Sequence, residues 1–353
     1  MEKHDHHTEE RFMARALELA ILGRGRVSPN PLVGCVIVHE DRIIGEGWHQ
    51  QYGGPHAEVN AVDSILDKSL LPLCTVYVTL EPCAHFGKTP PCTDLLIRHQ
   101  VRKVVVANVD SNPVVSGSGL KKLRDAGIEV VSGILDKEGR ELNKRFFTFM
   151  EEKRPYVILK WAETSDGLIA RKNYDSRWVT NEFSRQLVHR WRTEEDAFLV
   201  GSRTAQYDNP RLNVRDWSGP NPKRILIDRF LRVSDKHHLF DGTQHTLVYN
   251  VLKHEELHNL SLVRIDENEF LFNLMHDLHR KNIQSIVVEG GGETLQGFID
   301  AGLWDEARIF VSPKVFEAGI PAPRLSGLRV AEQKIGNDVL TIFQNLHAKR
   351  INQ

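Results

Sequence analysis

One imidazole and two thiols stand at a spacing that suits a catalytic zinc site. His56 lies in the segment PHAEVNAV, and Cys83 and Cys92 bound the segment CAHFGKTPPC. One histidine and two cysteinates suit tetrahedral Zn²⁺ and leave the fourth position to water, whereas a structural site takes four protein ligands. Bound zinc lowers the pKa of that water toward about 7, so hydroxide becomes available at neutral pH. We therefore predict that His56, Cys83 and Cys92 bind zinc.

Glu58 is the predicted proton carrier beside this site. It follows His56 by two residues and is not needed as a ligand, so its carboxylate is available to move protons between water and a leaving amine. Positions two apart in mid-helix face different directions, so both residues are expected at a helix start. Cys92 is also expected to open a helix, whose dipole helps to keep its thiolate ionised. Cys35 and Cys74 lie in or beside apolar strands and are expected to be core thiols.

The composition predicts two globular domains. A chain of 353 residues exceeds one ordinary domain, and 41% hydrophobic residues allow each half a core. The 46 basic and 47 acidic residues give a net charge of −1, without the basic excess of a nucleic-acid-binding protein. No apolar run reaches the roughly 18 residues of a membrane span. Four cysteines make no disulfide framework in so long a chain, so we expect a reduced cytoplasmic protein without membrane or nucleic-acid partners.

Helix and strand patterns alternate along the chain. In the first half we expect helices at 9–22, 56–67, 93–100 and 119–126 and strands at 33–38, 42–48, 75–80, 103–109 and 128–133. In the second half we expect helices at 181–193 and 268–280, strands at 156–162, 197–201, 224–228, 246–250, 285–292, 307–313 and 339–345, and a helix after the triple glycine. One helix at 136–154 separates the halves, assigned as domains 1–150 and 151–353. This alternation predicts α/β layers, with a largely parallel sheet in the first half.

The zinc-site residues resemble a known group of enzymes. Zinc deaminases carry H-x-E followed by P-C-x-x-C; here H-A-E is followed by P-C, with the second cysteine nine residues later. The longer interval resembles the riboflavin-pathway deaminases, which have a similar insert between the cysteines. The segment SPNPLVGC at 28–35 resembles their substrate-facing loop, which implies that Asn30 contacts the base. For His85, inside the insert, we favour a substrate role.

The second half resembles a reductase. The matching segments are LKWAETSDG at 159–167, SRW at 176–178, DNPRL at 208–212, Arg215, and VEGGG at 288–292. They are similar to the reductase domain of the bacterial bifunctional riboflavin-biosynthesis deaminase/reductase family, and the resemblance covers essentially the full chain in that family's domain order. It implies a cytidine-deaminase-like α/β/α domain followed by a dihydrofolate-reductase-like α/β domain. Thr164-Ser165, where Ser-Leu is usual, and the extra residue of the glycine turn differ from the family pattern.

The resemblance also implies the ligands of the second domain. NADPH is the implied cofactor, beside Zn²⁺ in the first domain. The implied cofactor contacts are Ala162, Trp178, Thr204, Asp208, Gly291, Gly292, Glu293, Thr294, Leu295, Gln296 and Gly297. The implied substrate contacts are Ser176, Arg192, Leu212, Arg215 and Glu289. Family members assemble through the reductase half, so a homo-oligomer formed by that domain is expected.

Several of these residue types suit the implied chemistry, and each has a structural alternative. Arg192 and Arg215 can bind a 5′-phosphate through forked hydrogen bonds, although single arginines more often form surface ion pairs. Lys160 and Glu289 are candidates to support protonation or opening of the sugar, or else form a buried ion pair. The triple glycine lets the backbone approach a phosphate at a helix start; a tight structural turn is the alternative.

The implied function is two consecutive steps of riboflavin synthesis. The first domain would deaminate 2,5-diamino-6-ribosylamino-4(3H)-pyrimidinone 5′-phosphate by hydrolysis. The second would reduce the ribosyl chain with NADPH to give 5-amino-6-(5-phosphoribitylamino)uracil. Two other classes stay open: a nucleic-acid base deaminase with an appended binding domain, and a non-catalytic scaffold that keeps zinc for its structure. The balanced charge argues against the first, and the presence of Glu58 argues against the second.

Overall fold

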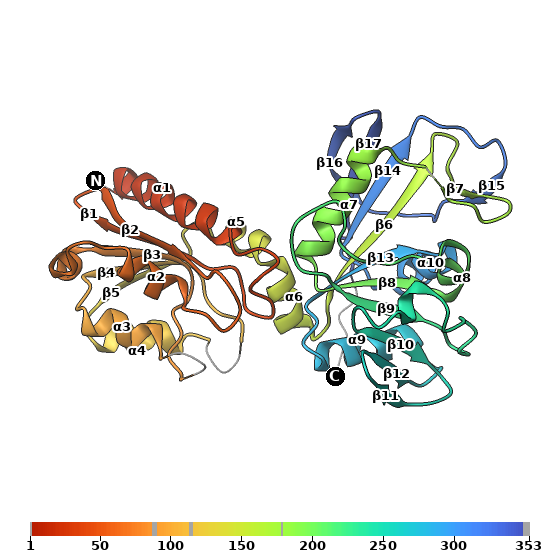
Figure 1. The fold of residues 1–353 in the computed structure, drawn as a ribbon. Coiled ribbons are helices and arrows are strands. Elements are labelled where there is room, and N and C mark those ends of the chain that lie inside the picture. The colour runs from red at the N-terminus through yellow and green to blue at the C-terminus, as the bar shows by residue number, and fades with distance from the viewer. Residues whose placement is uncertain (1, 87–89, 113–115, 178, 349–353) are drawn as a thin grey trace. The chain divides into compact units, whose positions relative to one another are not determined.

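The chain divides into two units, each built on a sheet of its own (Figure 1). Met1–Glu151 form the first unit and Glu152–Gln353 the second. The computed structural model describes residues 2–86, 90–112, 116–177 and 179–348. Trp178, one of the cofactor contacts implied by the resemblance, lies outside the described residues.

The first unit is a five-stranded sheet covered by helices on both faces. The strands lie in the order β2 (Arg42–Trp48), β1 (Gly34–His39), β3 (Thr75–Leu80), β4 (Lys103–Asn108) and β5 (Glu129–Ser132). The helices are α1 (Glu2–Ile21), α2 (Ala57–Asp63), the 3₁₀ helix η1 (Lys68–Leu73), α3 (Cys92–Arg98), α4 (Ser118–Asp125), α5 (Asp136–Leu142) and α6 (Lys144–Glu152). β1 runs antiparallel to both of its neighbours, so this sheet is mixed, and the expectation of a largely parallel sheet is wrong.

Two apolar cores hold the helices on this sheet. On one face, α1 places Phe12 and Met13 against Val36 of β1 and Val105 of β4. On the other face, side chains of α2, α3 and α4 share a core with the inner strands, and Leu96 of α3 is fully buried in it. Figure 1 shows α1 on one side of the strands and α3 and α4 on the other. The α/β/α architecture implied by the resemblance is confirmed.

Gly34 permits the close approach of α1 to β1. A methyl group at this position would lie 1.9 Å from the backbone oxygen of Ala16 and 2.8 Å from the backbone nitrogen of Ala20. Since backbone cannot give way as a side-chain end does, Gly34→Ala should lower the free energy of unfolding by about 3 kcal/mol. Urea unfolding followed by circular dichroism tests this, with Gly297→Ala as the control because its methyl group would meet only the end of the Leu271 side chain at 3.6 Å, an ordinary contact. An unchanged midpoint for Gly34→Ala would contradict the packing argument.

The connection predicted as one helix over 136–154 is two helices, so that expectation is wrong. α5 ends at Leu142 and α6 begins at Lys144, with Asn143 between them. The buried side chain of Asn143 accepts a hydrogen bond from the backbone N–H of Leu32 and donates one to the carbonyl oxygen of Leu32, both at 2.8 Å. This two-way pairing fixes the break between the helices and attaches the connection to the loop that carries Asn30.

The second unit is built on a ten-stranded sheet. Its order is β11 (Glu255–Leu257), β12 (Leu260–Arg264), β10 (Thr246–Asn250), β9 (Lys223–Ile227), β8 (Ala197–Gly201), β13 (Ser285–Gly290), β6 (Tyr156–Thr164), β14 (Glu306–Ser312), β17 (Asp338–Gln344) and β16 (Leu328–Ile335). A separate pair joins β7 (Leu168–Arg171) to β15 (Gly319–Pro321). Neighbours from β12 through β14 are parallel, and the outer pairs are antiparallel.

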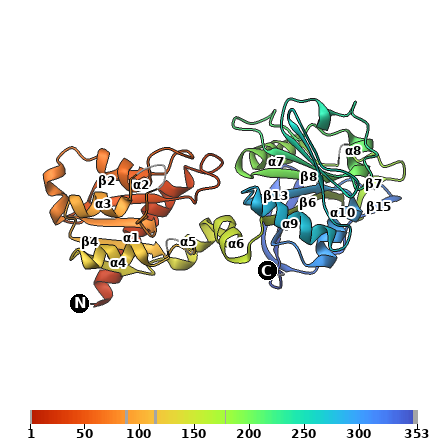
Figure 2. The same ribbon diagram turned by 90° about the horizontal axis from the view of Figure 1, so that it is seen from below.

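Helices again cover both faces of this sheet. They are α7 (Glu182–Glu194), α8 (Ser202–Asp208), the 3₁₀ helix η2 (His238–Phe240), α9 (Phe270–Arg280) and α10 (Gly292–Ala301). Leu274 of α9 and Phe298 of α10 belong to the core on one face, and Trp191 of α7 and Ala205 of α8 to the core on the other. Figure 2 shows α7 and α9 on opposite sides of the strands.

The parallel strands place their carboxyl ends at one edge of the sheet, where ligands of α/β proteins bind. β8 leads there into α8, and β13 leads into the glycine turn and α10. The hydrophobic pattern of the sequence did not predict β7, α8, β11, β12, β15 or β16. Most of these elements are too short to show a hydrophobic period, and β16 is exposed along almost its whole length.

In the described parts of the chain, no helix is both long enough and apolar enough to cross a membrane.

Candidate functional sites

The three predicted zinc ligands converge from three segments of the first unit. His56 precedes α2, Cys83 follows β3, and Cys92 opens α3 as expected. The Nδ1 atom of His56 lies 3.6 Å from the Sγ atom of Cys83 and 3.3 Å from that of Cys92. Ligands at about 2.1 Å (N) and 2.3 Å (S) from a tetrahedral zinc would lie about 3.6 Å apart. The donor set and its spacing therefore fit zinc, and no other such group occurs among the described residues.

Hydrogen bonds act differently on the thiols of Cys83 and Cys92. The Cys92 thiol donates to Cys83, and this bond contributes most to lowering the pKa of Cys83, to about 4. The backbone N–H of Cys92 also donates to the Sγ of Cys83 at 3.3 Å. These hydrogen bonds favour the thiolate form of Cys83, which is the form that binds metal.

Glu58 lies in the first turn of α2 with its side chain buried beside the ligands. Burial raises the pKa of Glu58, and the neighbouring Cys83 acts in the same direction. Its carboxyl group is in hydrogen-bonding contact with Cys92 but is not part of the ligand cluster. A buried carboxyl group that is not a ligand is suited to carry protons at the metal.

Asn30 lies in the same site, held by a histidine that the sequence analysis missed. The Nδ2 atom of Asn30 is 3.0 Å from Nε2 of His49, and Nδ1 of His49 is 3.0 Å from the carbonyl oxygen of Pro55. The ring of His49 packs edge-on against that of His56. Burial lowers the pKa of His49, so a neutral ring donates to Pro55 and accepts from Asn30. His85, in contrast, is exposed and outside the ligand cluster.

Glu81 is a second residue that the sequence analysis missed. Its buried carboxylate accepts hydrogen bonds from the backbone N–H groups of Asp110 at 3.2 Å, Gly117 at 2.9 Å and Gly119 at 2.8 Å. Because Glu81 stands two residues before Cys83, the segment that carries this predicted zinc ligand also fixes the start of α4.

Lys160, Arg192 and Glu289 form a charged cluster in the second unit. They come from β6, α7 and β13 respectively. Arg192 donates through Nη2 to Oε2 of Glu289 at 2.9 Å, while Nζ of Lys160 lies 3.8 Å from Oε1. Burial opposes ionisation of Glu289, but Arg192 and Lys160 outweigh it and lower its pKa. Oε1 is buried and has no hydrogen-bond partner, so it can accept a hydrogen bond from a ligand.

The two predicted phosphate-binding arginines share one neighbour. Nη1 of Arg192 donates to the carbonyl oxygen of Asn213 at 3.0 Å, and Nη1 of Arg215 donates to its Oδ1 at 2.5 Å. Leu212, the residue before this bridge, is buried with φ at +47°. The structure thus brings both guanidinium groups and the predicted contact Leu212 to one loop beside Glu289.

The predicted cofactor residues gather around the glycine turn between β13 and α10. Gly291 has φ at +79°, and a methyl group on it would lie 3.1 Å from Oγ1 of Thr294 and 3.3 Å from Oγ1 of Thr204. Ala162 lies on β6, three residues after Leu159, which pairs with Val288 of β13 just before the glycine turn. The segment 291–297 spans the turn and most of α10, whose first N–H groups are available to an anion.

Ser176 and Asp208 meet at the C-terminal end of α8. The hydroxyl group of Ser176 donates to the Asp208 carboxylate at 3.2 Å. Because Thr204 and Asp208 stand in the same short helix, α8 connects the glycine turn to the loop of Ser176. The structure therefore places a predicted substrate contact directly against a predicted cofactor contact.

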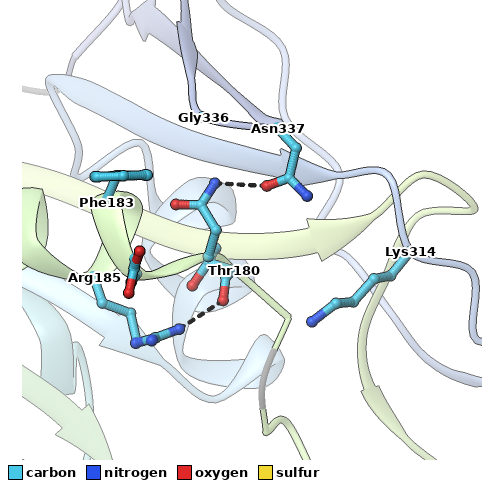
Figure 3. Close-up of a pocket in the computed structure, with 8 residues that line it drawn as sticks. Thr180, Phe183, Arg185, Lys314, Gly336 and Asn337 are labelled. Atoms are coloured by element: carbon cyan, nitrogen blue, oxygen red, sulfur yellow. Dashed lines mark hydrogen bonds between the residues drawn. The ribbon is translucent and has the colours of Figure 1, made fainter.

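A separate pocket of about 470 Å³ opens at the start of α7 (Figure 3). It is lined by Thr180, Asn181, Glu182, Phe183, Arg185, Lys314, Gly336 and Asn337. Arg185 donates to the carbonyl oxygen of Thr180 at 2.8 Å, and Asn181 donates to Asn337 at 2.9 Å. None of these eight residues belongs to the sets predicted from the sequence.

Fold and sites define a zinc-dependent deaminase joined to a reductase. Residues 6–108 match the model of the cytidine and deoxycytidylate deaminase zinc-binding region, and residues 155–335 match the RibD C-terminal domain. The riboflavin biosynthesis protein RibD of Aquifex aeolicus (strain VF5) is 39% identical, covering 95% of this chain and 98% of its own length. The RibD of Escherichia coli (strain K12) is 38% identical, covering 87% and 88%. The chain belongs to the RibD family of riboflavin biosynthesis proteins.

Solved structures agree with this assignment over both units. The diaminohydroxyphosphoribosylaminopyrimidine deaminase/5-amino-6-(5-phosphoribosylamino)uracil reductase of Thermotoga maritima has a TM-score of 0.88 and 38% identity, covering 96% of this chain and 99% of its own. A RibD structure from Acinetobacter baumannii also has a TM-score of 0.88, at 32% identity.

The chain is therefore a bifunctional enzyme of riboflavin biosynthesis. Its N-terminal deaminase uses zinc and its C-terminal reductase uses NADPH, and both act on small molecules. The predicted family, fold class, activities and cofactors are confirmed. This class of enzyme is neither a nucleic-acid base deaminase nor a zinc scaffold, the two alternatives that the sequence analysis left open.

Proposed function

We propose that residues 1–150 deaminate 2,5-diamino-6-ribosylamino-4(3H)-pyrimidinone 5′-phosphate. We further propose that residues 151–353 reduce the ribosyl chain of the product to give 5-amino-6-(5-phosphoribitylamino)uracil. The observation that carries the proposal is the buried carboxyl group of Glu58 beside three zinc-ligating atoms. The two arginines that meet at Asn213 beside Glu289 support a phosphorylated substrate. The Thermotoga maritima protein is described by these two activities.

In the deaminase site, this chain's residues hold the metal, contact the substrate and move protons. His56, Cys83 and Cys92 hold zinc, which when bound supplies a Lewis acid that activates water. Glu58 carries two protons in turn, so that one water is consumed and one ammonia is released. The proton that the attacking water loses goes to the ring nitrogen, and the proton that the resulting hydroxyl group loses goes to the departing amine. Asn30, oriented by His49, contacts the pyrimidine.

In the reductase site, positioning is the main contribution of the protein. NADPH when bound supplies the hydride. We assign its contacts to Ala162, Trp178, Thr204, Asp208, Gly291, Gly292, Glu293, Thr294, Leu295, Gln296 and Gly297. Substrate contacts are Ser176, Arg192, Leu212, Arg215 and Glu289, with the two arginines on the phosphate. Oε1 of Glu289 accepts a hydrogen bond from the sugar, and Lys160 supplies the proton that balances the hydride.

Assembly and location complete the proposal. We propose a homo-oligomer formed through the reductase domain, located in the cytoplasm, with neither nucleic acid nor membrane as a partner. The net charge of −1 supports the absence of a nucleic-acid partner. The four cysteines form no disulfide, which agrees with a reducing compartment.

An activity assay tests both steps together. Zinc-loaded protein should release ammonia from the pyrimidine phosphate without NADPH, and NADPH should be oxidised only after deamination. Ammonia release without oxidation of either NADPH or NADH would contradict the reductase assignment. No ammonia release from zinc-replete protein would contradict the proposed substrate.

Zinc removal should separate the two activities. The described ligand cluster lies entirely in the first unit, so dialysis against a strong zinc chelator should abolish ammonia release while reduction of the deaminated intermediate continues. Metal analysis and the two assays, before and after zinc is restored, measure this. Equal loss of both activities would contradict the assignment of zinc to the deaminase alone.

A further inference from the structure

His189 is a buried histidine that the proposed mechanism does not use. It lies on α7 three residues before Arg192, so both side chains project from the same face of the helix. Its Nδ1 atom accepts a hydrogen bond from the backbone N–H of Arg215 at 3.1 Å. On the other side of the ring, Nε2 lies 3.4 Å from the carboxylate of Asp216. The ring therefore contacts the backbone of one proposed phosphate-binding arginine and shares a helix face with the other.

The surroundings of His189 keep its ring neutral. Burial together with Arg192 on the same helix and Arg215 on the facing loop lowers the pKa of His189 to about 4, against the opposing effects of Asp216 and Glu289. A neutral ring that accepts at Nδ1 carries its proton on Nε2, where Asp216 can accept it. Nδ1 is thus available as an acceptor throughout the physiological range.

The loop at 213–215 is held at three successive residues. Asn213 binds both arginines, the N–H of Val214 donates to Oδ1 of Asn221 at 2.8 Å, and the N–H of Arg215 donates to His189. The side chain of Arg215 itself is exposed, so its backbone contact limits where the guanidinium group can go. A fixed pair of guanidinium groups binds a phosphate at a smaller loss of conformational entropy than a mobile pair.

We propose that His189 is a positioning residue of the reductase, which fixes Arg215 relative to Arg192 for the substrate's phosphate through the hydrogen bond accepted by Nδ1. This inference rests on the proposed binding of phosphate by the two arginines. His189 touches neither the sugar nor the cofactor in this arrangement. The effect of replacing His189 on the kinetics of the reductase should therefore depend on whether the substrate carries a phosphate.

Two substitutions isolate the acceptor atom. His189→Asn places an amide oxygen near the position of Nδ1 and keeps the acceptor, whereas His189→Leu fills a similar volume without one. With the phosphorylated intermediate, His189→Leu should raise KM about 10-fold at a similar kcat, as expected for one lost hydrogen bond to a binding element. With the dephosphorylated intermediate, kcat/KM should be unchanged, and His189→Asn should resemble the parent protein on both substrates.

Equal losses on both substrates would show a merely structural role and overturn the inference, and so would an unchanged KM in His189→Leu. Arg215→Gln tests separately whether the arginines bind the phosphate, on which the role of His189 rests. The preference for phosphate is the ratio of kcat/KM for the phosphorylated intermediate to kcat/KM for the dephosphorylated one. If this preference falls in Arg215→Gln but not in His189→Leu, the proposed role of His189 is refuted while the phosphate assignment stands. If the preference for the phosphorylated intermediate persists in both variants, the assignment of the phosphate to the two arginines is wrong. If His189→Leu does not fold, His189→Gln, whose amide reaches the Nε2 position, should show the same loss.

Discussion

Replacing Glu58 by glutamine should lower the rate of ammonia release about 1,000-fold, within the range of general acid–base catalysis, while zinc remains bound. Glutamine keeps the size of the side chain but cannot accept and release the proton that hydrolysis must move. The proposed zinc ligands are His56, Cys83 and Cys92, and Glu58 lies outside that cluster. Ammonia assays and zinc analysis of the same preparation measure the two quantities independently.

Two comparisons make the Glu58→Gln result decisive. Reduction of the deaminated intermediate should proceed at the parent rate, because the reductase residues lie in the second unit. His56→Ala should lose zinc and ammonia release together, because it removes a proposed ligand. Loss of zinc from Glu58→Gln would instead identify Glu58 as a ligand, and an unchanged rate of ammonia release would assign the proton transfer to another group.

The zinc site could be predicted from the sequence because its chemistry is local. His56 and Glu58 share one segment, Cys83 and Cys92 bound another, and each ligand stands at the end of an element. Spacing therefore carried most of the information. The supporting residues could not be found in this way. Glu81 acts on backbone groups near position 117, far along the chain, and only the fold brings them together.

The second unit shows the limit of sequence reasoning more clearly. Helix α8 has seven residues, too few to show a helical period, so Thr204 and Asp208 came only from the family resemblance. From the sequence alone, Lys160 and Glu289 fit either a catalytic pair or a buried ion pair. Their 3.8 Å separation, and the third member Arg192, depend on two strands and a helix that are distant in sequence.

Lys160→Met should lower kcat of the reductase at least about 100-fold with little change in KM, because it removes the proposed proton donor. Its Nζ atom is 3.8 Å from Oε1 of Glu289, too far for a hydrogen bond that would hold the proton. Burial lowers the pKa of Lys160, which Arg192 reinforces and Glu289 opposes. A lowered pKa makes a lysine a better acid near neutral pH. Steady-state kinetics with the deaminated intermediate measure the effect.

Lys160→Arg distinguishes proton transfer from simple charge pairing. Arginine keeps the positive charge beside Glu289 but does not release a proton at any physiological pH. Glu289 also keeps its hydrogen bond to Arg192 in either variant, so neither substitution leaves the carboxylate unpaired. If Lys160 donates the proton, Lys160→Arg should be as slow as Lys160→Met, with ammonia release unchanged in both. If Lys160→Arg instead reduces the sugar at the parent rate, the cluster serves only to place the charge of Glu289, and the proton must reach the sugar from another group.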